Sequence, residues 1–110
     1  MRIARIGSVG EERPVVIEGD EAIYVDTLIS DWSRQSLETG ALERVKAANL
    51  STLPRTSVHG HRYGSPINRP TKVICVGLNY LGHIAETGAE TPKEPVIFMK
   101  APDTIVGGND

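Results

Sequence analysis

Two side chains three residues apart, His83 and Glu86, are the best candidates in this sequence for acid–base chemistry. On a helix they would lie on the same face, where the carboxylate can accept a hydrogen bond from one imidazole nitrogen. Such a bond fixes the tautomer of the ring and makes the other nitrogen a better base toward a bound water. The spacing alone favours a simpler interpretation, an exposed helix pair worth about 0.2–0.5 kcal/mol. The surrounding residues must therefore decide between the two.

The elements around this pair are predicted from local patterns. The Val- and Ile-rich run Lys72–Gly77 predicts a strand buried on both faces. Asn79 is a suitable N-cap for a helix over Tyr80–Glu86, and Gly88 is placed to end that helix in a left-handed turn. A second strand is expected at Val96–Lys100. The candidate pair would then lie on a short helix between two apolar strands.

The same residues form a longer pattern that resembles a known family. Val-Gly-Leu-Asn-Tyr-x-x-His-x-x-Glu, followed by Glu-Pro-Val-Ile-Phe-Met-Lys, is similar to the opening of the catalytic domain in the fumarylacetoacetate hydrolase family. Members of that family have a strand, a Gly-x-Asn-Tyr turn, a His-x-x-Glu helix and a Pro-x-x-Phe-x-Lys strand in this order. The resemblance is strong over residues 70–110 and loose over residues 1–70.

The resemblance implies roles for individual residues. His83 and Glu86 match the family's dyad, which activates water or moves a proton. Lys100 matches a lysine directed toward the substrate pocket, where a cation can bind a carboxylate, although a solvent-exposed lysine at a strand end is an equally good interpretation. Tyr80 either lines the pocket or packs under the helix, and packing is favoured.

Two residues are assigned to the turn itself. Gly77 and Asn79 match the turn-shaping positions of the family, and their residue types suit such a turn independently of any resemblance.

The family's metal ligands have no counterpart in the sequence. Members hold Mg²⁺ or Mn²⁺ with a Glu-x-Glu pair and a further Asp, all beyond the Pro-x-x-Phe-x-Lys strand, and no such cluster precedes Asp110. We therefore expect the cation only in a full-length enzyme and predict that these 110 residues alone are inactive. His59-Gly60-His61 is interpreted as a solvated connector, and Asp103, Asn109 and Asp110 as turn residues.

The residue pattern of the amino-terminal part predicts a small antiparallel meander. Strands are expected at Arg2–Ser8, Pro14–Glu18 and Ala22–Val25, with Gly19-Asp20 as a hairpin turn. One helix is predicted from about Gly40 to Ala48, with a short turn before it, and residues 51–70 are predicted to be an extended connector over the surface. The fold class is α+β, with a small domain over residues 1–70 and the incomplete start of a mainly β catalytic domain over 71–110.

Bulk composition excludes several classes of protein. Apolar residues make up 39% and charged residues 24%, which is ordinary for a globular domain. A net charge of −2 without a sustained basic face argues against nucleic acid as a partner. The apolar runs are too short to cross a membrane. The single Cys75, predicted to pack as a small buried hydrophobe, suits a reducing compartment, and we expect a cytoplasmic protein.

The function implied by the resemblance is that of a metal-dependent enzyme acting on small dicarboxylic 2-oxo or enol acids. Carbon–carbon bond hydrolysis, enol–keto isomerisation and decarboxylation are all compatible with it, and a homodimer is expected. Two alternatives stay open: a folded, non-catalytic interaction module, and one half of a split enzyme that a second chain completes.

Overall fold

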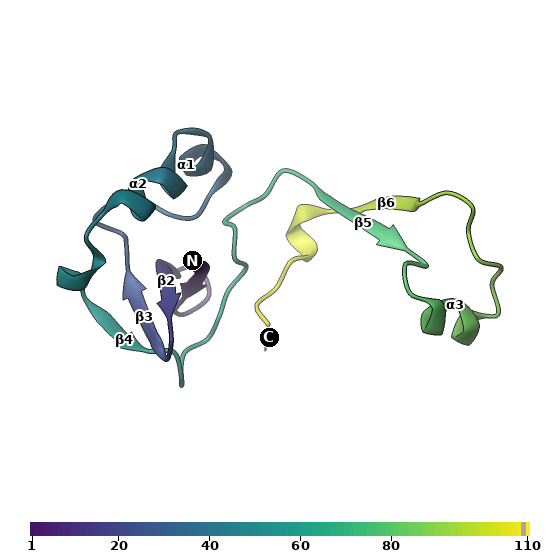
Figure 1. Cartoon of the computed structure of the whole chain (residues 1–110), viewed down its shortest axis with the longest axis horizontal. Coiled ribbons are helices and arrows are strands. Elements are labelled where there is room, and N and C mark those ends of the chain that lie inside the picture. Colours follow the sequence, from purple (N-terminus) through teal and green to yellow (C-terminus); the bar gives the residue numbers. More distant parts are fainter. Residues whose placement is uncertain (109) are drawn as a thin grey trace. The chain divides into compact units, whose positions relative to one another are not determined.

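The computed structural model describes residues 1–108 and 110, which form two compact units (Figure 1). The first contains Met1–Pro70 together with Ile105–Asp110, and the second contains Thr71–Thr104. These units differ from the predicted domains only in where the segment Ile105–Asp110 packs. That either unit is an independent domain stays a prediction.

The first unit is built on a four-stranded antiparallel sheet in the order β1-β2-β3-β4. The strands are β1 (Arg2–Ile6), β2 (Arg13–Glu18), β3 (Glu21–Tyr24) and β4 (Arg55–Ser57). Glu18 pairs with Glu21, so Gly19-Asp20 forms the predicted hairpin turn, with Gly19 at a φ of 56°. The predicted meander is thereby confirmed.

The connector over residues 51–70 is more structured than predicted. A short 3-10 helix, η1 (Leu50–Thr52), precedes β4, and β4 pairs with β3 through Ile23 and Arg55. The prediction of a plain extended connector was wrong because β4 reads Arg-Thr-Ser and has no apolar alternation. Its place at the sheet edge depends on backbone pairing rather than on side-chain burial.

Two short helices follow the third strand. Helix α2 (Ala41–Ala47) matches the predicted helix, while α1 (Arg34–Glu38) was predicted only as a turn. Ser33 caps α1, because its side chain accepts a hydrogen bond from the Ser36 amide and Ser36 returns the contact to the Ser33 amide. The left-handed Gly40, at a φ of 82°, joins the two helices.

Apolar side chains pack in two clusters in this unit. One contains the buried residues Val16, Val25, Ile29, Trp32, Ala41 and Val45, which join β2 to the helices. The other contains Ile6, Val15 and Ala22, with Tyr63 against them. Because Val15 and Val16 are neighbours on one strand and belong to different clusters, the sheet has an apolar side on each face.

The second unit is a two-stranded antiparallel ribbon with one α-helix. Strands β5 (Val73–Gly77) and β6 (Val96–Lys100) pair from Val73 opposite Lys100 to Gly77 opposite Val96. Helix α3 (Leu81–Thr87) lies between them in the sequence, and a short 3-10 helix, η2 (Pro102–Thr104), follows β6. Both strands agree with the sequence-based ranges.

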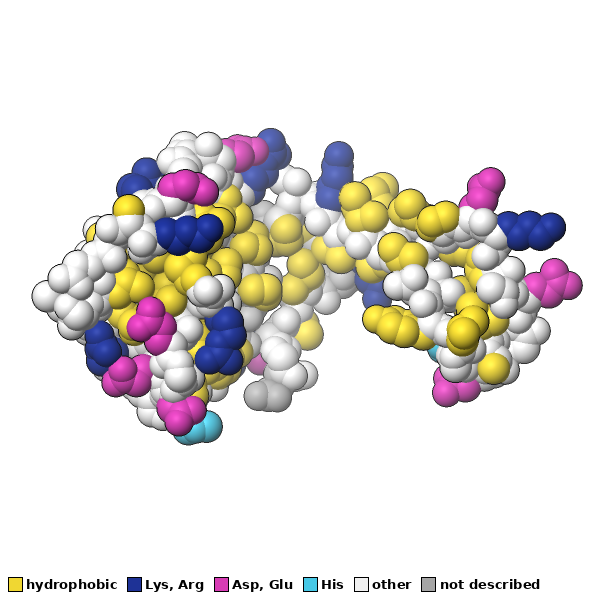
Figure 2. Space-filling model, in the orientation of Figure 1, with side chains coloured by type: hydrophobic (Ala, Val, Ile, Leu, Met, Phe, Trp, Pro, Cys, Tyr) yellow, Lys and Arg dark blue, Asp and Glu magenta, His cyan; other side chains and the backbone are white. Residues whose placement is uncertain are grey.

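The burial predicted for this ribbon is wrong for the described chain. Ile74 and Met99 face each other across the ribbon at 65% and 69% exposure, and Val76 and Ile97 follow at 50% and 64%. Cys75 is half-buried rather than buried. Figure 2 shows hydrophobic side chains at the surface along these strands. The apolar run indicated a covered strand, but no second layer lies over it within this unit.

Among the residues that the structure describes, no helix combines the length and the apolar character needed to span a bilayer.

Candidate active site

The turn between β5 and α3 sets the start of the candidate site. Its left-handed residue is Leu78, at a φ of 49°, an unusual conformation for a side chain of this size. Gly77 does not have a positive φ and ends β5 opposite Val96. The left-handed conformation of the turn therefore falls on Leu78, one residue after Gly77, and the turn-shaping role of Gly77 stays a prediction.

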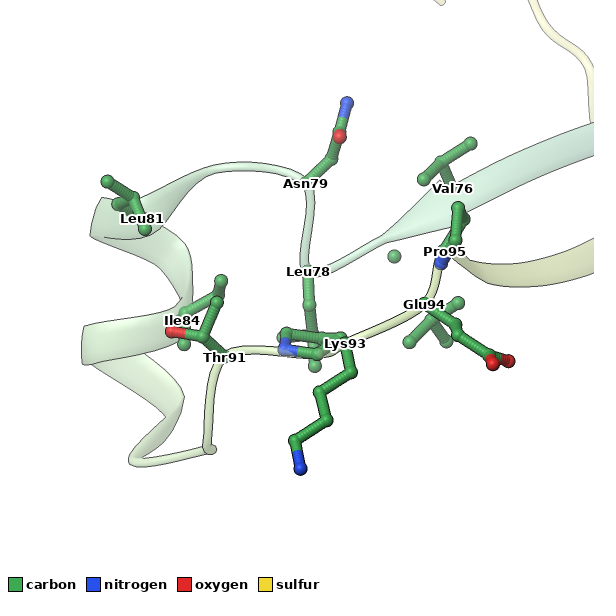
Figure 3. Close-up of a pocket in the computed structure, with 12 residues that line it drawn as sticks. Val76, Leu78, Asn79, Leu81, Ile84, Thr91, Lys93, Glu94 and Pro95 are labelled. Carbon is green, nitrogen blue, oxygen red and sulfur yellow. The ribbon is translucent and has the colours of Figure 1, made fainter.

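Helix α3 begins without a side-chain cap. Tyr80 is its N-cap residue, and the structure has no side-chain hydrogen bond there, so the predicted capping role of Asn79 was wrong. Figure 3 shows the Asn79 side chain directed away from the helix. At the other end Gly88 adopts a φ of 66° and donates its N–H to the carbonyl of Ala85, as predicted for a glycine C-cap.

His83 and Glu86 lie on the same face of α3. The imidazole Nδ1 and the carboxylate Oε2 are 3.6 Å apart, with 58% and 79% of the two side chains exposed. This distance brings the charges into contact range when the ring is protonated and is longer than a hydrogen bond. The helix is held to its unit through Ile84, which is only 6% exposed. The pair is thus presented to solvent, with Glu86 facing Nδ1.

A pocket of about 320 Å³ lies beside this helix in the second unit (Figure 3). Residues 76–79 line one side of it, residues 91–96 line another, and Leu81 and Ile84 contribute from α3. His83 and Glu86 are not among the lining residues, and the structure therefore does not place the pair inside this pocket.

The two predicted substrate-binding residues lie apart from the pocket as well. Tyr80 is 75% exposed and does not pack under the helix, contrary to the favoured interpretation. Lys100 is the last residue of β6, opposite Val73, and is also exposed. Neither side chain lines the pocket, and their roles in substrate binding stay predictions.

Within the described part of the chain, no group of three or more His, Cys, Asp or Glu side chains could hold a metal ion. The oxygens and imidazoles considered from the sequence are used otherwise: His61 Nε2 lies 3.2 Å from Thr56 Oγ1, Asp103 is part of η2, and Asp110 pairs with Arg62. Asn109 lies outside the described residues. The residues that the structure describes therefore do not fit an Mg²⁺ or Mn²⁺ site.

Sequence reasoning missed a cluster of buried and partly buried charges in the first unit. Arg5, with only 7% of its side chain exposed, donates from Nε to Asp31 at 2.7 Å. Arg62 donates to Glu12 at 2.7 Å, and this hydrogen bond is the main cause that lowers the pKa of Glu12. The partners are far apart in the sequence, 50 residues in the case of Arg62 and Glu12. No local pattern pairs residues at such separations.

Comparison with known proteins places these observations in context. No protein-family model matches the chain. A "Putative hydrolase" from Burkholderia ambifaria is 38% identical over 111 residues, which cover 100% of this chain and 39% of that protein. A protein similarly named from Burkholderia multivorans is 37% identical over the same share of both chains. The chain thus spans about two fifths of the length of these relatives.

Solved structures give the same picture. A structure described as "a putative HpcE protein" from Mycobacterium smegmatis superimposes with a TM-score of 0.68 at 28% identity, covering 96% of this chain and 38% of the other. The fumarylacetoacetate hydrolase of Exiguobacterium antarcticum gives a TM-score of 0.60 at 28% identity, with 96% and 37% covered. By sequence and by fold, this chain is therefore similar to somewhat more than a third of these longer proteins, one of which is a fumarylacetoacetate hydrolase.

Proposed function

We propose that the complete protein is a hydrolase-type enzyme in which His83, oriented by Glu86, is the general base. The observation that carries the proposal is the placement of the two side chains on one face of α3, with 3.6 Å between Nδ1 and Oε2. Similarity to the E. antarcticum fumarylacetoacetate hydrolase over 96% of the chain supports the choice of reaction class.

The geometry of the pair gives each residue a distinct task. Glu86 faces Nδ1, so a modest side-chain rotation closes a hydrogen bond to that nitrogen and leaves the Nε2 lone pair free. Nε2 then accepts a proton from a water molecule as the water attacks a carbonyl carbon. The resulting imidazolium is stabilised by the Glu86 carboxylate and returns the proton to the departing carbanion. Water is consumed and a carbon–carbon bond is broken, with no oxidation or reduction.

The substrate class follows from the bond that must break. Carbon–carbon cleavage by water requires a leaving carbanion stabilised as an enolate, which a 2-oxo acid or an enol acid provides. Lys100, at the end of β6, is the proposed cation for a substrate carboxylate. Isomerisation and decarboxylation pass through the same kind of enolate, so they belong to the same proposal as alternative outcomes.

A divalent cation enters the proposal only for the complete protein. Mg²⁺ or Mn²⁺ is expected there from the family resemblance, while the described residues form no ligand set for it. The steps assigned to this chain are proton transfer and orientation, which His83 and Glu86 perform with their own groups.

The test is an assay of the complete protein against acylpyruvates, oxaloacetate and hydroxymuconate-type dienes. We expect turnover of at least one substrate class, and a clear fall in kcat for Glu86→Gln, which keeps the side-chain shape and removes the charge. Glu90→Gln, a change of another acidic residue just beyond the same helix, is the matched control and should leave kcat unchanged. No turnover of any substrate by the complete protein would favour the non-catalytic module instead.

A further inference from the structure

The segment Ile105–Asp110 packs with the first unit, although residues 71–104 separate it in the sequence from the remainder of that unit. Its contacts concentrate on Arg62 and Tyr63. Gly108 donates its N–H to the Tyr63 carbonyl at 3.3 Å, and Gly107 is buried at this point. The segment therefore returns to the connector just before the residues that lead into the second unit.

All three nitrogen atoms of the Arg62 guanidinium donate hydrogen bonds. Nε and Nη2 donate to the two carboxylate oxygens of Asp110 at 2.6 and 2.5 Å, the planar two-bond geometry that makes arginine–carboxylate pairs strong. Nη1 donates to Glu12 at 2.7 Å and to the Gly7 carbonyl at 3.4 Å. Arg62 thus faces β1 and its turn on one side and the returning segment on the other.

The inner partner of Arg62 is itself fixed. Glu12 is only 10% exposed at its side chain and accepts a hydrogen bond from the Gly10 amide at 3.1 Å. Arg5 lies 3.6 Å from the same carboxylate. Because Glu12 contacts Gly10, Arg5 and Arg62, it holds the guanidinium of Arg62 in the orientation that faces Asp110.

We propose that Arg62 is a clamp that holds the segment Ile105–Asp110 against the rest of the first unit. Glu12 is the positioning residue of this clamp, and the close approach of the segment also requires glycine at position 107. The clamp ties the return of the chain after residue 104 to the connector that leads away before residue 71. It does not depend on the proposed catalytic role of α3.

The requirement at Gly107 is independent of charge. A Cβ there would clash with the Tyr63 carbonyl oxygen and would lie 2.9 Å from Asp110 Oδ2. A backbone oxygen cannot move aside as a flexible side chain can. By contrast, a Cβ at the neighbouring Gly108 would meet nothing within 4 Å. The two adjacent glycines therefore form a matched pair for a test.

Charge complementarity supports the same contact. The hydrogen bonds from Arg62 hold the pKa of the Asp110 carboxyl below its usual range, and the Gly107 amide, donating to Oδ2 at 2.8 Å, acts in the same direction. The ionised carboxylate is thus the form that the clamp binds.

Amide hydrogen exchange on the full 110-residue chain tests the clamp. Near neutral pH, Arg62→Gln, Asp110→Asn and Gly107→Ala should each speed exchange in residues 105–108 by roughly tenfold or more, as expected when local opening becomes easier. Exchange in β2 should stay at the wild-type rate. Gly108→Ala and Arg34→Gln, which breaks only an exposed ion pair with Glu38, should leave residues 105–108 protected.

Unchanged protection of residues 105–108 in both Asp110→Asn and Gly107→Ala would overturn the proposal. So would equal loss of protection in Gly107→Ala and Gly108→Ala, since it would mean that the segment does not approach Tyr63 closely. If Arg62→Gln unfolds the sheet, the Asp110→Asn and Gly107→Ala results decide, because neither residue belongs to a strand of the sheet.

Discussion

The indole of Trp32 is fully buried in the first unit and donates from Nε1 to the Val15 carbonyl at 3.1 Å. It lies in the cluster that joins β2 to α2, beside Val16 and Val45. Its backbone amide also donates to Asp31, the carboxylate that Arg5 binds. A single residue therefore links the apolar cluster to the buried charges.

Replacing Trp32 tests the two contributions separately. Trp32→Phe removes the hydrogen bond from the indole to the Val15 carbonyl and should cost about 0.5–1.5 kcal/mol of unfolding free energy. Trp32→Ala also opens a cavity and should cost about 3–5 kcal/mol. Urea unfolding followed by circular dichroism measures both, with Val9→Ala, at a 75% exposed position, as the control. Equal losses for Phe and Ala would show that packing contributes little.

The Glu12 carboxylate should make the stability of the first unit sensitive to acid. The hydrogen bond from Arg62 lowers the pKa of Glu12, so this carboxylate stabilises the fold fully above its unfolded pKa of about 4.3 and loses that contribution as the pH falls through the lower folded value. We expect stability of the first unit to fall below about pH 4. Glu12→Gln should be less stable than wild type near neutrality, and the two should converge in acid. Parallel stability curves for the two proteins would contradict the assignment.

Residues with local partners were predictable from the sequence, and residues with distant partners were not. His83 and Glu86 are three residues apart on a helix, and this spacing alone predicts that their side chains lie on the same face. The left-handed Leu78 was not foreseen because glycine is the usual residue at such a φ and Gly77 stands next to it. The Arg62 contacts require the finished fold.

Among the secondary-structure elements, the apolar alternation of the first three strands predicted the meander. Strand β4 was not predicted, because it is short and polar and depends on backbone pairing. Helix α1 was not predicted for a related reason. It has five residues, and its capping by Ser33 and Ser36 resembles an ordinary serine-rich turn in sequence. Elements held by packing have a sequence pattern, whereas those held by backbone hydrogen bonds have little.

Gly88 determines where α3 ends. Gly88 ends the helix at a φ of 66° in open space, so Gly88→Ala introduces backbone strain alone, about 1–2 kcal/mol. Gly82, inside the helix and equally open, is the matched control, and Gly82→Ala should stabilise the helix by about 0.5–1 kcal/mol. Amide exchange in residues 81–88 should rise in the first variant and fall in the second. Slower exchange in Gly88→Ala than in the wild type would mean that α3 does not end at Gly88.

At the scale of the whole molecule, the ribbon face formed by Ile74, Val76, Ile97 and Met99 is the largest departure from the sequence-based expectation. The run of apolar residues indicated burial, and within the second unit these side chains are half or more exposed. The apolar residues of the two strands indicate a face that packs against other residues. The 110 residues span 39% of the length of the curated relative from Burkholderia ambifaria.

The exposed ribbon face should make the 110-residue chain bind a hydrophobic dye such as ANS. Ile97→Lys should reduce dye fluorescence clearly, since Ile97 lies within the face. Val9→Lys, at an isolated exposed apolar residue of the first unit, should not. Equal fluorescence from the Ile97→Lys variant and the wild type would show that the dye binds elsewhere.

We propose His83 as the general base of the complete protein, and kcat of the complete protein with His83→Ala tests this role most directly. We expect a fall of about 10²–10⁴-fold, the usual contribution of a general base, with little change in melting temperature because 58% of the His83 side chain is exposed. His59→Ala, in the connector of the first unit, should retain wild-type kcat. A His83→Ala enzyme that turns over at the wild-type rate would contradict the account.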